Sequence, residues 1–156
     1  MVERPAIVDL FCGVGGMTLG FIRAGFSVAA AFDNWDCAVD TYRTNLGNHV
    51  HQAAISDDVE LPPATVIIGG PPCQGFSSAG ARRTDDHRNT LVAVYARLVA
   101  KHKPRAFVFE NVEGFLTSDS GRFIFDLLDP LIEAGYRIRN RSRSLVRPEV
   151  FMALRA

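Results

Sequence analysis

A cysteine that follows a short apolar run is the residue of this sequence best suited to covalent chemistry. The run from Val66 to Gly69 is rich in β-branched residues and breaks into Gly70-Pro71-Pro72-Cys73, which predicts a buried parallel strand that ends in a stiff turn. Open α/β sheets bind ligands at the carboxyl ends of their strands, so this turn would present a nucleophilic thiol to a ligand. The alternative is that Cys73 is a small buried hydrophobic residue, as free cysteines often are.

An acid lies at the tip of a second apolar strand. Glu110 follows Phe107-Val108-Phe109, and partial burial there would raise the pKa of its carboxyl group, so that it holds or donates a proton near neutral pH. We expect the strands that end near Cys73 and Glu110 to be neighbours. A thiol beside a proton-donating carboxyl group is the pair that nucleophilic addition to a heteroaromatic ring requires.

A glycine-rich turn marks a third strand tip. Gly13, Gly15 and Gly16 follow an apolar strand and precede a helix, so the main chain can approach a ligand and the helix N-terminus offers N–H groups to an anion. Thr18 stands where a dinucleotide fingerprint would have its third glycine, so a carboxylate is as good a ligand as a pyrophosphate. A tight turn that packs the helix on the sheet, without any ligand, is the other interpretation.

The fourth tip carries another acid. Asp33 ends a strand about 20 residues after the glycine turn, where nucleoside-binding α/β folds place a carboxylate on the ribose hydroxyls. Together the two tips suggest an adenosine cofactor. Asp33 could instead be a solvated cap, although Asn34 or Asp36 can also fill the capping role for the next helix.

Strands and helices alternate in the elements that would position these residues. Apolar or β-branched runs predict strands at 6–11, 27–32, 49–55, 66–69, 106–110 and 136–145, and 3.6-residue patterns predict helices at 17–24, 36–45, 90–102 and 122–134, the last interrupted by Pro130. This order predicts an α/β fold with a doubly wound, mostly parallel sheet whose strand tips lie on one edge.

The length of 156 residues allows one α/β domain, which we assign to residues 1–145, with 146–156 left unassigned. From Arg137 onward six arginines stand against Glu149 alone. That basic segment could meet phosphates, and a solvent-facing edge strand explains it equally well.

The sequence shows no sign of a membrane, a leader or a metal. It has no apolar run of membrane-spanning length, and Glu3 and Pro5 stand where a signal peptide would have its basic and apolar regions. Cys12, Cys37 and Cys73 are odd in number and lack metal or redox spacing. We therefore expect a cytoplasmic protein without a membrane segment, a disulfide framework or a metal.

Four motifs occur in order over about residues 6–136. They are Asp9-Leu10-Phe11-x-Gly13-x-Gly15-Gly16, Gly70-Pro71-Pro72-Cys73-Gln74-x-Phe76-Ser77, Asp86-x-Arg88-Asn89-x-Leu91 and Glu110-Asn111-Val112. In this order and spacing they resemble the motifs of the DNA (cytosine-5) methyltransferases. The resemblance implies a Rossmann-like fold of the S-adenosylmethionine-dependent methyltransferases, here truncated.

The resemblance also implies the site and its chemistry. The cofactor would be S-adenosyl-L-methionine, with its methionine end on the Phe11–Gly16 turn and its ribose on Asp33, in a pocket lined by Phe11, Asn34, Ile55, Pro72 and Leu91. Cys73 would add to carbon 6 of a cytosine while Glu110 interacts with N3. The base would be flipped out of double-stranded DNA, and a segment with Arg88 would close over it.

The chain departs from the family pattern in two places. Ala54 stands where family members often have an acid against the adenine amino group, and only Asp57 or Asp58 could substitute for it. The Gln-x-Arg-x-Arg motif, the target-recognition region and a C-terminal helix are absent. We expect activity to need a complementing chain, and the alternatives are a tRNA cytosine-5 methyltransferase or a cofactor- or DNA-binding module without turnover.

Overall fold

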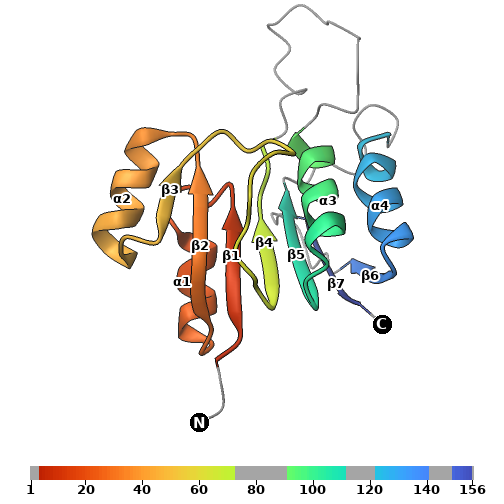
Figure 1. Ribbon diagram of the computed structural model, residues 1–156, viewed down its shortest axis with the longest axis horizontal. Coiled ribbons are helices and arrows are strands. Elements are labelled where there is room, and N and C mark those ends of the chain that lie inside the picture. The colour runs from red at the N-terminus through yellow and green to blue at the C-terminus, as the bar shows by residue number, and fades with distance from the viewer. Residues whose placement is uncertain (1–3, 73–90, 112–121, 141–148, 156) are drawn as a thin grey trace, which may run out of the picture.

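Seven strands form one sheet in the computed structural model, which describes residues 4–72, 91–111, 122–140 and 149–155 (Figure 1). The strands are β1 (Ala6–Leu10), β2 (Ser27–Asp33), β3 (Val50–Gln52), β4 (Val66–Gly69), β5 (Ala106–Asn111), β6 (Tyr136–Asn140) and β7 (Glu149–Arg155). The helices are α1 (Gly16–Arg23), α2 (Asp36–Leu46), α3 (Leu91–His102) and α4 (Arg122–Glu133).

The strand order is β3-β2-β1-β4-β5-β7-β6. Neighbouring strands from β3 to β5 pair in parallel, and β7 runs antiparallel to both β5 and β6. The order reverses direction between β1 and β4, and sheets of this kind bind their ligands at such a reversal, at the carboxyl ends of the strands. The doubly wound, mostly parallel sheet expected from the sequence is confirmed.

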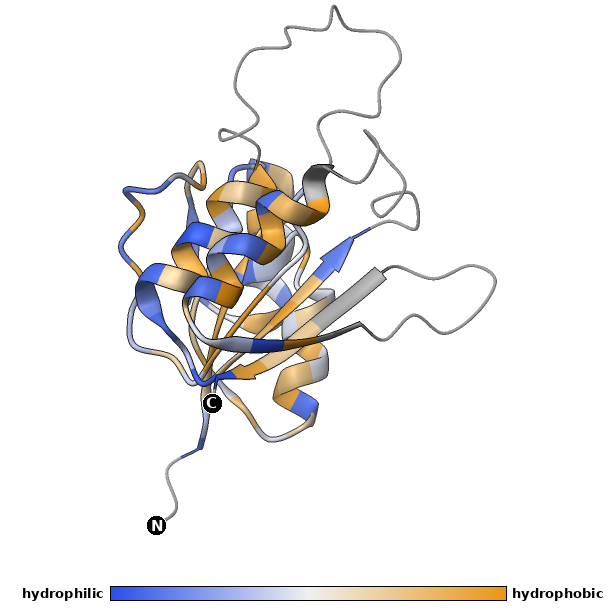
Figure 2. Ribbon diagram, turned by 90° about the vertical axis from the view of Figure 1, so that its right-hand side faces the viewer, coloured by the Kyte–Doolittle hydropathy of each residue, from blue (hydrophilic) through white to orange (hydrophobic). Residues whose placement is uncertain are grey.

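Alternation along the strands divides the core between two faces. Val8, Leu10, Ile67, Phe107 and Phe109 share one cluster with buried residues of α3 and α4. Residues between them point to the other face, where one cluster joins Ile7, Val66 and Ile68 to α1, and another joins Ala31 and Val50 to α2. In the view turned by 90°, α4 and α1 lie on opposite sides of the apolar strands (Figure 2).

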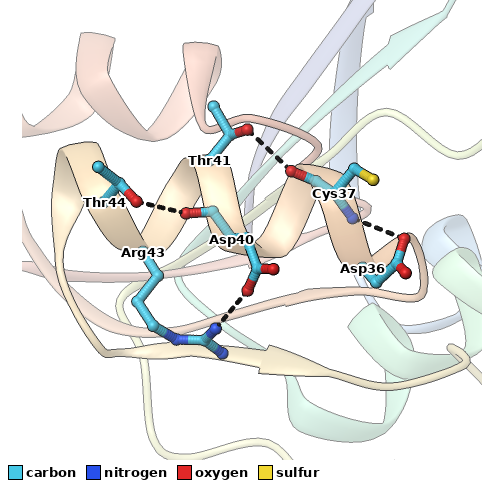
Figure 3. A network of polar contacts seen from close by, with 6 residues as sticks. All are labelled: Asp36, Cys37, Asp40, Thr41, Arg43 and Thr44. Atoms are coloured by element: carbon cyan, nitrogen blue, oxygen red, sulfur yellow. Dashed lines mark hydrogen bonds and ion pairs between the residues drawn. The ribbon is translucent and has the colours of Figure 1, made fainter.

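Helix α2 has an apolar inner face and a polar outer face. Ala38, Val39 and Tyr42 are buried, whereas the outer side chains bond within the helix: Asp40 pairs with Arg43 at 2.8 Å, and the Thr41 and Thr44 hydroxyls donate to carbonyls one turn back (Figure 3). The inner face therefore carries the helix's contacts with the rest of the molecule.

Three local expectations were wrong or incomplete. The N-cap of α2 is Trp35, and neither Asn34 nor Asp36 caps the helix. The Asp36 carboxylate accepts a hydrogen bond from the adjacent Cys37 N–H, and the Asp33 carboxylate accepts one from the Trp35 N–H. Pro130 lies inside a continuous α4. Residues 149–155, to which the sequence assigned no element, form β7 between β5 and the edge strand β6.

Among the helices in the described parts of the chain, none combines the length and the apolar character that a membrane span needs.

Candidate active site

The turn after β1 is held in a backbone shape that ordinary residues rarely adopt. Phe11, Gly13 and Gly15 all have positive φ values, of 60°, 53° and 92°. The Cys12 N–H donates to the Phe32 carbonyl at 3.0 Å, and the Gly15 N–H donates to the Cys12 carbonyl at 2.9 Å. A strained non-glycine residue in a tight turn is typical of a ligand site, where surrounding contacts impose the conformation.

The glycines of this turn serve two different purposes. A Cβ atom on Gly15 would lie 2.3 Å from Leu46 Cδ1 and 2.8 Å from Tyr42 Cδ2, so Gly15 lets the turn pack against α2. Cβ positions on Gly13 and Gly16 have no atom within 4 Å. These two glycines therefore leave room for a group to approach the main chain at the start of α1.

Asp33 fastens the end of β2 to this turn. Its Oδ2 accepts a hydrogen bond from the Gly13 N–H at 2.8 Å, and its Oδ1 accepts one from the Trp35 N–H at 2.9 Å. An ionised carboxylate has about four lone-pair sites, so each oxygen can still accept a bond from a ligand diol. The carboxylate thus orders the turn and keeps capacity for a ribose.

Trp35 lies at the candidate site, and sequence reasoning missed it. It is the only tryptophan of the chain, it follows Asp33 by two residues, and 63% of its surface is exposed. An exposed aromatic ring beside a strand-tip carboxylate is suited to stacking on a base. The sequence signal for a role of Trp35 was its position close to Asp33, the acid at the strand tip.

Glu110 reaches the strand tip that leads to Cys73. Gly69 pairs with Phe109 in the β4–β5 ladder, so Gly70 lies opposite Glu110. A Cβ on Gly70 would be only 2.7 Å from Glu110 Oε2, which means that the absence of a side chain at position 70 makes room for the carboxyl group. Burial raises the pKa of Glu110, as the sequence predicted.

Asn111 connects the same two strand ends. Its Nδ2 donates to the Pro71 carbonyl at 3.0 Å, and only 4% of its surface is exposed. This buried bond fixes the start of the segment that carries Cys73. Sequence reasoning assigned no role to Asn111, although a polar residue directly after an apolar strand was a signal for one.

The remaining predicted residues lie in different surroundings. Cys73 and Arg88 lie outside the described residues. Ile55 is 7% exposed and belongs to the main core cluster, Leu91 is half-buried at the start of α3, and Asn34 and Pro72 are exposed. Asn34, Ile55 and Pro72 follow the carboxyl ends of β2, β3 and β4, and Leu91 begins α3.

The acid loop after β3 is bound to α3. Arg97 donates from Nε and Nη2 to the two oxygens of Asp57 at 2.8 and 2.9 Å, which lowers the pKa of Asp57, and Lys101 pairs with Glu60 at 3.2 Å. Asp57 is therefore already engaged by a guanidinium and is a poor substitute for an acid at position 54. Asp58, the other candidate, is exposed.

A third residue that sequence reasoning missed lies beneath the glycine turn. Asp9 is 1% exposed and accepts a hydrogen bond from the Thr18 hydroxyl. Desolvation by burial raises the pKa of Asp9 to about 7, and hydrogen bonds from Thr18 oppose that rise. The one sequence signal for a role of Asp9 was a charged residue inside an apolar strand, at a position where the pattern predicts a core residue.

Within the described residues, His, Cys, Asp and Glu side chains do not gather in groups of three that could ligate a metal.

The model of the family described as C-5 cytosine-specific DNA methylase matches residues 6–145. The chain belongs to this family. M.AgeI, a Type II methyltransferase of Thalassovita gelatinovora, is 39% identical in an alignment of 140 residues that covers 83% of this chain and 33% of M.AgeI. M.HgiGI, a Type II methyltransferase of Herpetosiphon aurantiacus, is 42% identical in an alignment of 112 residues that covers 68% of this chain and 89% of M.HgiGI.

Solved structures of methyltransferases share the fold. A prophage-encoded DNA modification methyltransferase from E. coli is 29% identical with a TM-score of 0.77, over 97% of this chain and 47% of that one. S. pombe Dnmt2 superposes with a TM-score of 0.75 over 98% of this chain and 50% of its own, and at 19% identity it shows the fold alone. The chain spans 33 to 43% of M.AgeI, M.HindV and M.BspRI.

Proposed function

We propose that this chain is the cofactor-binding and catalytic part of an enzyme that methylates carbon 5 of cytosine in DNA. The family match supports the reaction class. The observation that carries the proposal within the chain is the meeting of Gly70 and Glu110, because it joins a partly desolvated acid to the loop that leads to Cys73. S-adenosyl-L-methionine is the proposed methyl donor.

The residues of the turn fit this donor. Gly13 and Gly16 leave open space at the N-terminus of α1, where unpaired N–H groups suit a carboxylate. Asp33 keeps acceptor capacity for a ribose diol, and the exposed ring of Trp35 lies beside it. When bound, the donor supplies an electrophilic methyl group on a sulfonium.

The proposed reaction needs a nucleophile because carbon 5 of cytosine reacts poorly by itself. The thiolate of Cys73 would add to carbon 6, and the electron pair displaced in the ring makes carbon 5 enamine-like. Carbon 5 then accepts the methyl group and loses its proton to a base. Breaking the bond from Cys73 to carbon 6 restores the aromatic ring and the thiolate.

Glu110 would stabilise the negative charge that this addition creates on the ring. Negative charge develops toward N3 of the ring as the thiolate adds, and burial raises the pKa of Glu110, so that its carboxyl group keeps a proton to higher pH than a solvated glutamate would. Hydrogen bonding or proton donation from Glu110 to N3 would therefore lower the barrier to addition. Because carbon 6 is inaccessible in a stacked duplex, the cytosine must first be flipped out.

We further propose that a complementing polypeptide covers the uncovered part of the sheet. In the β5–β7 ladder Ala153 faces the main core with Phe107, so Met152 and Leu154 face the opposite side. There 38% of Met152 and 70% of Leu154 are exposed, and the apolar clusters described on that side hold residues of β1 to β5 and none of β7. The additional length of relatives such as M.AgeI is the proposed source of the cover.

A covalent trap tests the proposed reaction. DNA with 5-fluorocytosine at the target blocks elimination, so the chain together with its complementing part should form a denaturation-resistant adduct. Cys73→Ser should abolish the adduct, while Cys12→Ser and Cys37→Ser should leave it intact. A reconstituted pair that binds DNA and cofactor but forms no adduct with Cys73 present would show a binding module without turnover.

A further inference from the structure

A chain of hydrogen bonds runs beneath the glycine turn toward the surface, and no step of the proposed reaction uses it. The Thr18 hydroxyl donates to Oδ2 of Asp9, the Tyr42 hydroxyl donates to Thr18 Oγ1 at 3.3 Å, and Nε2 of His49 lies 3.0 Å from the Tyr42 hydroxyl. Asp9, Thr18 and Tyr42 are at most 1% exposed, whereas His49 is half-buried. We call these four residues the buried relay.

The buried relay supports the turn from below and from the side. Asp9 lies in β1 two residues before the strained Phe11, and Thr18 lies in the first turn of α1. The ring of Tyr42 blocks the Cβ position of Gly15 at 2.8 Å and meets the ring of His49 edge-on, with centroids 5.5 Å apart. A change at His49 can therefore reach the turn through two residues in direct contact.

Counting donors fixes the direction of the relay. An ionised Asp9 only accepts hydrogen bonds, so Thr18 must give it its single proton, Tyr42 must give its proton to Thr18, and His49 must carry a hydrogen on Nε2. When Asp9 is protonated, every bond can reverse, and Nε2 of His49 then accepts. The charge of Asp9 and the tautomer of His49 are thus coupled through two hydroxyl groups.

Asp9 is the buried member of the relay whose charge changes near neutral pH. Burial raises its pKa to about 7, and the negative charge of Asp33 adds to the rise. Burial also raises the pKa of Tyr42, so this hydroxyl stays neutral. For His49, burial and the neighbouring His51 lower the pKa. The thiol of Cys12, which also faces Asp9 and Asp33, has a pKa raised by burial and stays protonated.

We propose that His49 is a positioning residue for the cofactor turn, which it controls through Tyr42, Thr18 and the charge of Asp9. The inference rests on the proposed function, because the ligand concerned is the methyl donor. S-adenosylmethionine carries one more positive charge than its demethylated product. A buried carboxylate beneath the turn should therefore favour the methyl donor over the product, and by linkage the donor should favour ionised Asp9.

The coupling itself can be measured without any ligand. Nitrogen NMR on histidine-labelled protein should show a hydrogen on Nε2 of His49 at high pH, with the signal assigned by His49→Gln. Asp9→Asn, Thr18→Val and Tyr42→Phe should each move the His49 titration midpoint by about 0.5 pH units or more, the size expected from one hydrogen bond, while Thr18→Ser should restore it. His102 at the end of α3, outside the relay, serves as the internal control. A His49 midpoint that is the same in all of these proteins overturns the relay.

The effect on the turn has its own readout. Amide resonances of Gly13 and Gly15 should titrate with Asp9, and His49→Phe, which keeps a ring against Tyr42 but has no nitrogen, should move that midpoint. The pair Asp40 and Arg43 on the outer face of α2 supplies a control, since Arg43→Ala should leave the glycine midpoint unchanged (Figure 3). Glycine signals that do not respond to His49→Phe overturn the positioning role, even if the chain binds no cofactor.

Affinity completes the test. Quenching of Trp35 fluorescence, which arises from the only tryptophan, can follow binding of S-adenosylmethionine and of its product between pH 6 and 8.5. The affinity for the donor should rise as Asp9 ionises, and His49→Phe should cost about fivefold at pH 7, as expected for one hydrogen bond, and little at the highest pH. Equal losses for both ligands at every pH would indicate a merely structural role. Absence of binding by the wild type together with its complementing part, with intact NMR coupling, would contradict the proposed cofactor instead.

Discussion

The position of the Glu110 carboxyl group depends on the absence of a side chain at Gly70, and a substitution at Gly70 tests this. A Cβ at position 70 would lie 2.7 Å from Glu110 Oε2, so Gly70→Ala must move the carboxyl group. The carboxyl is the far end of a flexible side chain, and Gly70 is not among the glycines with positive φ, so the free energy of unfolding should change little. Methyl transfer by the complemented enzyme should fall by at least about tenfold, because misplacing a reacting group is costly.

Gly20→Ala is the matched control for that substitution. Gly20 lies inside α1, and nothing lies within 4 Å of its Cβ position. Alanine there should stabilise the helix by up to about 1 kcal/mol and leave the rate unchanged. Thermal melts and single-turnover rates of both variants separate the two effects. Normal turnover by Gly70→Ala would remove Glu110 from the proposed chemistry.

At the scale of elements, Asn111 joins the end of β5 to the loop after β4. Its side chain donates to the Pro71 carbonyl from a buried position. Asn111→Ala leaves that carbonyl without this partner, and an unsatisfied buried group costs about 1 to 3 kcal/mol. We expect denaturant melts to show a loss in this range, together with faster hydrogen exchange in β4. A loss confined to β7, with β4 unchanged, would contradict the link.

The elements that carry the site were predictable where sequence runs are apolar and end in glycine, proline or an acid. The tips at Gly13, Asp33 and Glu110 follow directly from such runs, since parallel strands place their carboxyl ends together. The roles of Asp33 on the ribose and of Cys73 as the nucleophile stay predictions.

Other features depend on contacts that no local pattern encodes. Asp9 bonds to Thr18 only when α1 packs on β1, and the hydrogen bond that continues from Thr18 toward the surface comes from Tyr42 on α2. Strand β7 pairs with β5 and β6 from a segment that has no clear alternation of its own. Antiparallel insertion between two strands is decided by those neighbours, so the sequence of the segment alone does not reveal it.

The stability of the whole molecule should depend on the protonation of Asp9. Its pKa is raised from 3.8 to about 7 in the folded protein, so the folded state holds a proton that the unfolded chain releases. The stabilising contribution is therefore complete below about pH 4 and is lost as the pH rises to about 7. Each pH unit between the two values corresponds to about 1.4 kcal/mol, so the loss approaches about 4 kcal/mol.

Asp9→Asn should remove this part of the pH dependence, because an amide does not ionise. Urea unfolding at pH 5 and pH 8 should show a smaller decrease for the variant than for the wild type. Burial also raises the pKa of Glu110, so Glu110 likewise lowers stability as the pH rises. The pKa of His49 is lowered, so His49 has the opposite effect on stability. Comparing wild type with variant isolates Asp9. Identical decreases in both proteins would show that Asp9 is not the titrating group.

The exposed residues Met152 and Leu154 of β7 bear on how the whole molecule is assembled. If a complementing polypeptide covers β7, Leu154→Arg should weaken its association by about 10- to 100-fold, the range expected from the loss of a buried leucine side chain. The isolated chain should stay folded, since 70% of Leu154 is exposed. Phe125→Arg is the control, because Phe125 is similarly exposed on α4, which packs on the opposite face of the sheet. Titration calorimetry with the remaining part of a relative as a second chain measures both. Weakening by Phe125→Arg alone would place the partner on the α4 side and leave the β7 face without the role proposed for it.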